Sequence, residues 1–316
     1  MISFLLRRLL AAVPILIGVS VVVFIIIKII PGDPVASLLG PTSTPEARAA
    51  LESRLGLDQP LPVQYLQWVW HLLQGDLGTS ISKQTQVLGL VLDAFWNTLI
   101  LTAFAAILAF AMGIALGAVA ALRRGKAVAA LSNAIALISI SLPQYSVGLL
   151  LIIYIATGTG LLPTAGMYDA IGGGGWGDLF QHMVLPGVTA ALVPAGIIAR
   201  MFRTTVIDVM SMDFIDALRA RGMSERRILL HAFHNTTPTL LTIAGLQLGY
   251  LLGGVVFVET VFSWPGIGLL VFQSIAQRDL PVIQAGVIVS ALAFVVINLV
   301  VDALHATIDP RMRAHS

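Results

Sequence analysis

Long apolar stretches alternate with shorter polar segments along this chain of 316 residues. A helix needs roughly 20 apolar residues to cross a bilayer core about 30 Å thick. Six stretches meet this requirement, and they cover approximately residues 9–30, 94–122, 130–157, 183–202, 238–262 and 282–306. The pattern predicts an all-α polytopic membrane protein with six transmembrane helices. The first stretch is too long for a signal peptide and lacks a small-residue cleavage site, so we expect it to remain as an anchor.

The composition also favours a bilayer. Hydrophobic residues make up 57% of the chain and charged residues 11%, and the mean hydropathy is +0.92, whereas soluble domains carry about 25% charged residues. The formal net charge is only +2, which gives no reason to expect nucleic acid as a partner. Cysteine is absent, which excludes disulfides, thiolate metal sites and thiol nucleophiles.

Basic residues are distributed unequally between the two sides of this arrangement. Thirteen of the 18 fall on one side, namely Arg7, Arg8, Arg123, Arg124, Lys126, Arg200, Arg203, Arg219, Arg221, Arg226, Arg227, Arg311 and Arg313. Loops rich in lysine and arginine stay in the cytoplasm. We therefore expect both termini to be cytoplasmic, which agrees with an even number of spans.

The polar segments divide the chain into three parts. Residues 1–93 are predicted to form the first transmembrane helix and an extracytoplasmic segment with short helices. Residues 94–306 are predicted to form a five-helix core that includes a cytoplasmic loop, 204–237, and residues 307–316 a cytoplasmic tail.

Two short helices are predicted in the extracytoplasmic segment. Thr44 is suited to cap a helix with Pro45 in its first position, and Gly56 is suited to end it. A second helix should follow Pro62 and lie on the membrane or cap the bundle. It carries three large aromatic residues suited to the headgroup layer, which are Tyr65, Trp68 and Trp70.

The cytoplasmic loop 204–237 predicts a helix-turn-helix. Residues 213–221 should form a short helix ended by Gly222, and Ser224 is suited to cap a second helix that begins with Glu225. Each arginine at a bilayer centre costs about 2.5–3.5 kcal/mol on insertion scales, so the arginines of this loop should keep it outside the lipid.

One face of the first short helix in this loop is apolar. Phe214, Ile215 and Leu218 fall on that face at helical spacing, whereas Arg219 and Arg221 project elsewhere. Two interpretations follow from the pattern. The loop is either a solvated connector or a rigid element that docks into another protein.

Motifs for catalysis or ATP binding are missing from the sequence. Gly125-Lys126 lacks the other residues of a phosphate-binding loop, and His231 and His234 lack the spacing and the glutamate of a zinc-binding helix. We therefore expect no metal site and no ATP hydrolysis by this chain. Uphill transport would draw its energy from an ion gradient or from a partner.

Few ionisable groups fall within the predicted spans. Glu259 lies near the outer interface, where it would form a structural pair or act in an outer gate, and Asp302 is expected to be structural. The other polar groups are mild and should mostly make helix–helix contacts. They are Asn97, Thr98, Thr102, Asn133, Ser139, Ser141, Gln144, Thr242, Gln247, Ser290 and Asn298.

Proline and glycine mark three further places. Pro143 should kink the third span, where Ser139 can compensate the freed carbonyl, and the kink would line a cavity or serve packing. Gly113 and Gly117 favour the close approach of another helix. The glycine run 172–175 favours a flexible external loop over a ligand cradle.

Many short motifs follow one another in a fixed order. They are Pro31-Gly32-Asp33-Pro34, Leu55-Gly56-Leu57-Asp58-Gln59-Pro60-Leu61 with Gln64-Tyr65, Gly75-Asp76-Leu77-Gly78-Thr79-Ser80, Ser141-Leu142-Pro143, Leu162-Pro163 with Gly166, Leu185-Pro186, Glu259-Thr260-Val261-Phe262-Ser263-Trp264-Pro265-Gly266-Ile267-Gly268, Arg278-Asp279-Leu280-Pro281, Asn298-Leu299-Val300-Val301-Asp302 and Asp309-Pro310-Arg311. Together they make the chain resemble the membrane-spanning permease of an ATP-binding-cassette importer of the dipeptide, oligopeptide and nickel class, specifically the first permease subunit of the pair.

The resemblance implies a type I importer permease fold in the bacterial cytoplasmic (inner) membrane. It further implies that the chain is a non-catalytic subunit of a heterodimer with a second permease. Two ATPase subunits inside would bind the ATP and Mg, a solute-binding protein outside would deliver the solute, and no cofactor would be held by this chain. The cargo implied is a dipeptide or oligopeptide.

Within this resemblance, the loop is similar to the family's "EAA" loop, which fits into a groove on the ATPase. Asp216 takes the acidic position, whereas Leu218 and the late Pro238 depart from the general pattern. The implied coupling residues are Asp213, Phe214, Ile215, Asp216, Ala217, Leu218, Arg219, Arg221, Gly222, Ser224, Glu225 and Arg226. The candidates for the pathway or a gate are Pro143, Gln144, Gln247, Glu259 and Trp264.

Other functions stay open at this point. Nickel, glutathione or another small solute would use the same kind of permease, although no histidine cluster lines the spans. An ion-coupled secondary transporter is a second class, and an intramembrane enzyme a third. Dependence of uptake on ATP rather than on an ion gradient distinguishes the first class from the second.

Overall fold

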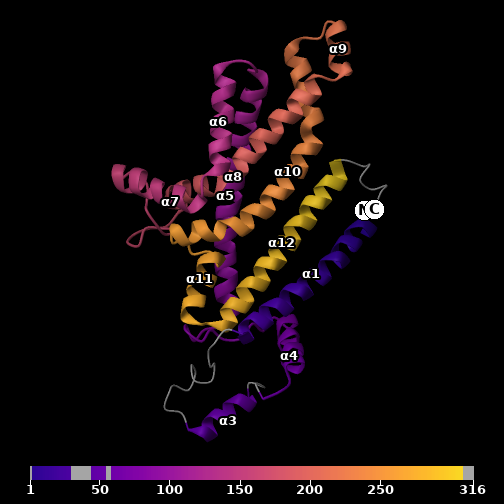
Figure 1. The fold of residues 1–316 in the computed structure, drawn as a ribbon. Coiled ribbons are helices and arrows are strands. Elements are labelled where there is room, and N and C mark those ends of the chain that lie inside the picture. Colours follow the sequence, from indigo (N-terminus) through magenta and orange to yellow (C-terminus); the bar gives the residue numbers. More distant parts are fainter. Residues whose placement is uncertain (1, 30–43, 55–57, 309–316) are drawn as a thin grey trace.

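The computed structural model describes residues 2–29, 44–54 and 58–308, and the regular elements in these ranges are helices (Figure 1). Five of them are long and apolar enough to cross a membrane. They are α1 (Ile2–Ile29), α5 (Val87–Leu122), α8 (Trp176–Met210), α10 (Glu225–Val261) and α12 (Leu280–Ile308). A bent pair of helices covers the third predicted stretch and brings the number of spans to six if the pair is counted as one span. The prediction of an all-α polytopic membrane protein is therefore confirmed, with five or six candidate spans among the described residues.

The third span bends where Pro143 breaks it. α6 (Ala127–Ser141) and α7 (Gln144–Leu151), which continues as the π-helix η1 (Ile152–Thr157), meet at an angle of 105°. Proline cannot donate a helical hydrogen bond and disfavours helical backbone in the residue before it. The kink is thus confirmed, but the Ser139 hydroxyl donates to the carbonyl of Ile135 (2.8 Å), so the compensation expected from Ser139 is not made.

Several elements extend beyond the predicted spans. α5 begins at Val87 and α8 runs from Trp176 to Met210, so both continue past the apolar stretches into the aqueous layers. The second short helix predicted after Ser224 is wrong as a separate element, because α10 continues through Pro238 to Val261. A further helix, α11 (Ile267–Gln277), was not predicted, since it is too short to cross a bilayer.

The centre of the bundle is the contact between α5 and α8. Gly113 and Gly117 of α5 face α8 so closely that an added Cβ would lie 2.7 Å from the Cβ of Ile198 and 2.6 Å from the carbonyl oxygen of Ala199. Small residues also line the facing side of α8, where Ala191, Ala195 and Ala199 are buried. Two backbones approach this closely only where side chains are small, as the spacing of the two glycines predicted.

The first and last spans pack against each other, with α1 and α12 side by side (Figure 1). Arg8 near the start of α1 pairs with Asp302 near the end of α12 at 2.9 Å. The structural role expected of Asp302 is therefore supported. The two ends of these helices lie on the same side of the bundle, as an even number of spans requires.

The segment predicted to be extracytoplasmic contains both expected helices, α3 (Pro45–Arg54) and α4 (Leu61–Leu73). The end expected at Gly56 lies outside the described residues. α4 packs on the outer end of α1, where Tyr65 shares a hydrogen bond of 2.7 Å with Ser20 and its ring lies 5.5 Å from that of Phe24. This contact explains why aromatic residues recur in α4.

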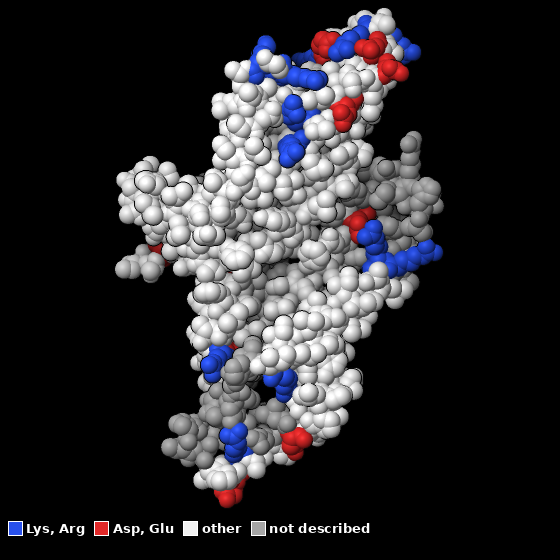
Figure 2. All heavy atoms as spheres, viewed as in Figure 1, with Lys and Arg blue, Asp and Glu red and all other residues white. Residues whose placement is uncertain are grey.

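Charged side chains gather mainly at the two ends of the molecule, and the wide band between them is mostly apolar, with charged atoms at its right edge and a few acidic atoms at its left edge (Figure 2). One end carries α9 (Asp213–Ala220) and the turn between α5 and α6; the other carries α3, α4 and α11 (Figure 1). This distribution is the one expected for a protein that spans a bilayer.

The close contact between α5 and α8 generates the first prediction. Replacing Gly117 with alanine should lower the free energy of unfolding by about 1–3 kcal/mol, because the added methyl group overlaps a backbone carbonyl. Gly89→Ala in the same helix is the matched control, since a Cβ there meets nothing within 4 Å. Thermal unfolding of the purified variants measures the difference, and equal melting temperatures would contradict the packing.

Candidate functional site

The first candidate site is α9 with the turn that follows it. Gly222 has φ +74°, its N–H donates to the carbonyl of Arg219 (2.9 Å), and the N–H of Met223 donates to the carbonyl of Leu218 (3.2 Å). These two bonds form the usual glycine-terminated end of a helix. Gly222 therefore ends the helix as predicted, and a residue without left-handed backbone freedom would not fit there.

α9 is anchored to two long helices by one fully buried side chain. Ile215 packs with Val209 of α8 and with Ile228 and Ala232 of α10, and Leu218 packs at the edge of this cluster. Phe214 differs from the prediction, since it is 36% exposed and does not join the buried cluster. The helix is thus a fixed extension of α8 and α10, and the structure does not support a loosely solvated connector.

Charged groups join α9 to the beginning of α10. Arg219 donates to Glu225 (3.0 Å) and to Asp216 (3.1 Å). The hydrogen bond and charge of Glu225, followed by those of Asp216, raise the pKa of Arg219. These groups are exposed, so their attraction is screened by water and stabilises little. Ser224 occupies the predicted N-cap position of α10, but its side chain makes no capping hydrogen bond.

The remaining residues of the predicted coupling loop lie on its outer surface. They are Asp213, Ala217, Arg221 and Arg226, and all four are exposed. With Phe214 and Asp216 they leave a mixed apolar and charged face without a partner in the described chain. α9 projects at one extremity of the molecule (Figure 1), where this face is accessible to another protein.

The second candidate site is centred on Glu259 at the opposite end of α10. Its carboxylate is fully buried and accepts hydrogen bonds from Thr98 of α5 (2.6 Å) and from the N–H groups of Gly268 (2.7 Å) and Leu269 (3.3 Å) at the start of α11. Helix N-termini favour negative charge. Glu259 therefore joins three helices, which supports a structural role and gives no sign of a free ionisable group.

Trp264 belongs to the same cluster as Glu259. Its indole N–H donates to the carbonyl of Asn97 (3.0 Å), while the Asn97 amide donates to the carbonyl of Pro265 (3.0 Å). Thr98 also accepts from the N–H of Ile267 (2.8 Å). The helix–helix contact expected of Thr98 is confirmed, whereas Asn97 contacts the turn between α10 and α11. We call the cluster of Asn97, Thr98, Glu259 and Trp264 the outer knot.

Pro143, Gln144 and Gln247 are not part of the outer knot. Pro143 precedes α7, and Gln144 donates to the carbonyl of Ala190 in α8 (3.3 Å). Gln247 is buried in α10, and its Oε1 finds no partner among the described residues. The structure therefore does not bring the five predicted pathway or gate residues into one site.

A second buried carboxylate joins the segment before α5 to the turn between α11 and α12. Asp279 accepts hydrogen bonds from the hydroxyls of Ser80 and Ser82 and from the N–H groups of Ile81 (3.1 Å) and Ser82 (3.0 Å). Burial opposes ionisation of this carboxyl, but the hydrogen bonds from Ser80, Ser82 and Ile81 outweigh it and lower the pKa of Asp279. The motifs at Gly75–Ser80 and Arg278–Pro281 thus meet in space, a contact that sequence reasoning missed.

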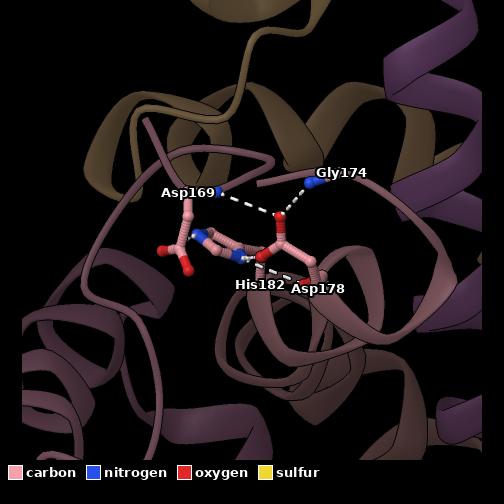
Figure 3. Close-up of polar contacts among 4 residues, drawn as sticks. All are labelled: Asp169, Gly174, Asp178 and His182. Atoms are coloured by element: carbon pink, nitrogen blue, oxygen red, sulfur yellow. Dashed lines mark hydrogen bonds and ion pairs between the residues drawn. The ribbon is translucent and has the colours of Figure 1, made fainter. Parts of the chain in front are cut away.

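A third cluster lies where the external loop joins α8 (Figure 3). The Asp178 carboxylate accepts from the N–H groups of Asp169 (3.1 Å) and Gly174 (2.8 Å). The buried His182 places Nδ1 2.9 Å from Asp178 Oδ1 and Nε2 3.7 Å from Asp169 Oδ1. The glycine run 172–175 is therefore tied to α8, although its composition had favoured a flexible loop.

Among the described residues, this third cluster is the one group that could supply three metal ligands. One ligand atom each from Asp169, Asp178 and His182 lies within 4.8 Å of the others, and imidazole and carboxylate ligands suit several divalent ions. In the structure, however, these side chains already hold one another and the loop. His231 and His234, the pair considered from the sequence, are exposed on α10 and are not part of such a group.

Residues 113–314 match the family described as binding-protein-dependent transport system inner membrane component, and residues 1–102 match the family of its N-terminal part. The chain belongs to this family. It is an ATP-binding-cassette importer permease, a multi-pass protein of the inner membrane that works with ATPase and solute-binding partners.

Curated relatives match along almost the full length. The glutathione transport system permease protein GsiC of Salmonella typhimurium is 40% identical over 314 residues, which cover 99% of each chain. GsiC of Escherichia coli K12 is 38% identical with the same coverage. The dipeptide transport system permease protein DppB of Alkalihalophilus pseudofirmus is 39% identical over 332 residues, which cover 99% of this chain and all of the relative.

The fold is shared with a solved transporter. An inward-facing structure of the MetNI methionine ABC transporter superimposes with a TM-score of 0.56 and 20% identity, covering 70% of this chain and 96% of that one. This likeness confirms the importer permease fold.

The outer knot generates the second prediction. Thr98→Val removes the hydrogen bonds to Glu259 and Ile267 and should lower the free energy of unfolding by about 1–3 kcal/mol, because a buried carboxylate and a buried N–H lose a partner. Thr102→Val is the matched control, since Thr102 is also buried in α5 but its hydroxyl has no partner among the described residues. Thermal unfolding compares the two variants; a loss of stability as large for Thr102→Val would refute the assignment.

Proposed function

We propose that this chain carries short peptides across the cytoplasmic membrane as the first permease of a heterodimeric importer. Its similarity to DppB and to GsiC supports this cargo, because DppB belongs to a dipeptide system and glutathione is itself a tripeptide. Both relatives match over almost the full length of this chain, so the compared region spans the segments that contain the outer knot and α9.

The observation that carries the mechanism is the continuity of α10. This helix begins at Glu225 beside α9 and ends at Val261, just beyond Glu259 of the outer knot. Its 37 residues span about 55 Å at 1.5 Å per residue. Movement imposed on α9 therefore reaches the outer end of the bundle through one element, without crossing a loop.

In this mechanism α9 is the lever on which a partner ATPase acts. The exposed face of α9 meets the ATPase, while buried Ile215 transmits the displacement to α8 and α10. Closure of two ATPase subunits around ATP and Mg would swing the bundle from an inward to an outward opening. This chain binds neither ATP nor Mg and performs no hydrolysis; both termini and α9 face the cytoplasm.

Uptake measurements test the cargo. Inner-membrane vesicles containing the permease with its neighbouring subunits should accumulate a labelled dipeptide or tripeptide when ATP and the solute-binding protein are supplied. Glutathione and Ni²⁺ serve as parallel substrates. Peptide uptake that persists with an uncoupler supports the proposal, whereas uptake of Ni²⁺ alone, or uptake that follows the proton gradient, would overturn it.

Variants of the turn after α9 test the lever. Gly222→Pro should reduce uptake more than tenfold while the chain still inserts into the membrane, because proline cannot adopt φ +74° or donate to Arg219. Gly222→Asn is the matched control, since asparagine tolerates left-handed backbone, and it should retain most of the activity.

Substitution of Asp216 and Ala217 by arginine tests the exposed face of the same helix. This double variant should lose both uptake and co-purification of the ATPase. Both residues lie on the exposed face of α9, so two bulky cations there would obstruct the proposed contact with the ATPase. Normal uptake by Gly222→Pro with ATPase association unchanged would contradict the lever.

A further inference from the structure

Basic side chains surround a hollow at the end of the molecule where α5 turns into α6. The hollow has a volume of about 400 Å³, and its polar lining comes from Arg124, Lys126, Asn133 and Arg203. These residues belong to the turn after α5, to α6 and to α8. Figure 2 shows basic atoms gathered at this end, above the apolar band.

The positive charges in the hollow are not neutralised within the described part of the chain. Neither Arg124 nor Lys126 nor Arg203 forms an ion pair or donates a side-chain hydrogen bond to a described residue. The Nε atom of Arg203 is buried and has no partner there. A buried, unpaired guanidinium N–H costs free energy, so an acceptor from outside the chain would relieve that cost.

The start of α6 adds a second attraction for an anion. α6 begins in the wall of the hollow with Ala127, and Lys126 at its N-cap position makes no side-chain capping bond. The first N–H groups of a helix and its dipole favour negative charge. Three cationic side chains and an uncapped 15-residue helix thus face one small space.

A second hollow, lined by apolar residues and by two arginines, continues from the first along α6. It has a volume of about 290 Å³, shares Asn133 and Arg203 with the first, contains Arg200, and is otherwise lined by Ala136, Leu137 and Ile140. The two hollows together offer a site for a phosphate and, next to it, a path for hydrocarbon. A free phosphate would use only the first part.

We infer that these adjoining hollows bind the phosphate group and part of an acyl chain of an anionic phospholipid in the cytoplasmic leaflet. Basic pockets between transmembrane helices on this side of a membrane are suited to such headgroups. The lipid would link the α5–α6 turn to α8, the helix whose Val209 packs on Ile215 of α9. This site is independent of the cargo and of the ATPase contact.

Lipid titration of the purified full-length chain tests the inference. In neutral detergent, phosphatidylglycerol bound to the chain is counted by native mass spectrometry, with phosphatidylcholine and glycerol phosphate in parallel arms. Arg124→Gln and Lys126→Gln should each weaken phosphatidylglycerol binding about fivefold, since each nearby cation contributes about that factor. Both residues are exposed, so neither variant should affect folding.

Arg123→Gln is the matched control, because Arg123 is exposed and adjacent but does not line the hollow. It should change phosphatidylglycerol binding less than twofold. An equal effect of Arg123→Gln would mean diffuse surface attraction and would overturn the site. Equal competition by glycerol phosphate would mean a soluble phosphate ligand and would overturn the lipid.

Arg203→Gln provides a readout besides binding. It removes a half-buried cation whose buried Nε has no partner among the described residues, so the lipid-free chain should melt at the same or a higher temperature than the wild type. The increase in melting temperature that phosphatidylglycerol gives the wild type should be lost in this variant. If Arg203→Gln keeps this increase in melting temperature, the inference is contradicted. It is also contradicted if a variant of the hollow loses co-purification of the ATPase while it binds phosphatidylglycerol normally.

Discussion

Buried or half-buried carboxylates hold the irregular backbone at the outer end of this protein. Every backbone N–H group that lies outside a helix and near the hydrocarbon needs a hydrogen-bond acceptor. Glu259 accepts from the start of α11, Asp279 from the segment before α5, and Asp178 from the loop before α8. Each carboxylate belongs to a long helix or its edge; Asp279 and Asp178 bind non-helical segments, and Glu259 binds the first turn of α11. The non-helical parts are thereby positioned as firmly as the spans.

Ile215, which anchors α9, packs against one end of α8 and α10, and Asp178 and Glu259 lie near the opposite ends of these two helices. Ile215 fixes α9 to α8 and α10, and Glu259 fixes the other end of α10 to α5 and α11. Between them, α5 and α8 pack through glycine and alanine at backbone distance. A close-packed interface of this kind cannot deform gradually. Movement of the bundle is therefore expected to carry α5 and α8 together rather than to slide one gradually along the other.

The sequence predicted the elements that a single physical rule determines. Apolar length located the six spans, Pro143 located the bend, Gly222 located the end of α9, and Gly113 with Gly117 located a close helix contact. Order and spacing of motifs then identified the importer class. What could not be predicted depends on contacts between distant segments. Nothing local in Asp279 indicates that it binds residues 80–82, and nothing local in Glu259 indicates that α11 begins at its carboxylate. Phe214 shared an apolar face with Ile215, yet only Ile215 found a buried partner.

Pro238 leaves α10 without one backbone hydrogen bond partway along its length. Proline cannot donate the helical hydrogen bond to the carbonyl of His234, so the helix is weakest about 20 Å from its beginning. Any bending of α10 is therefore expected at Pro238, between the part that packs on Ile215 and the part that carries Glu259.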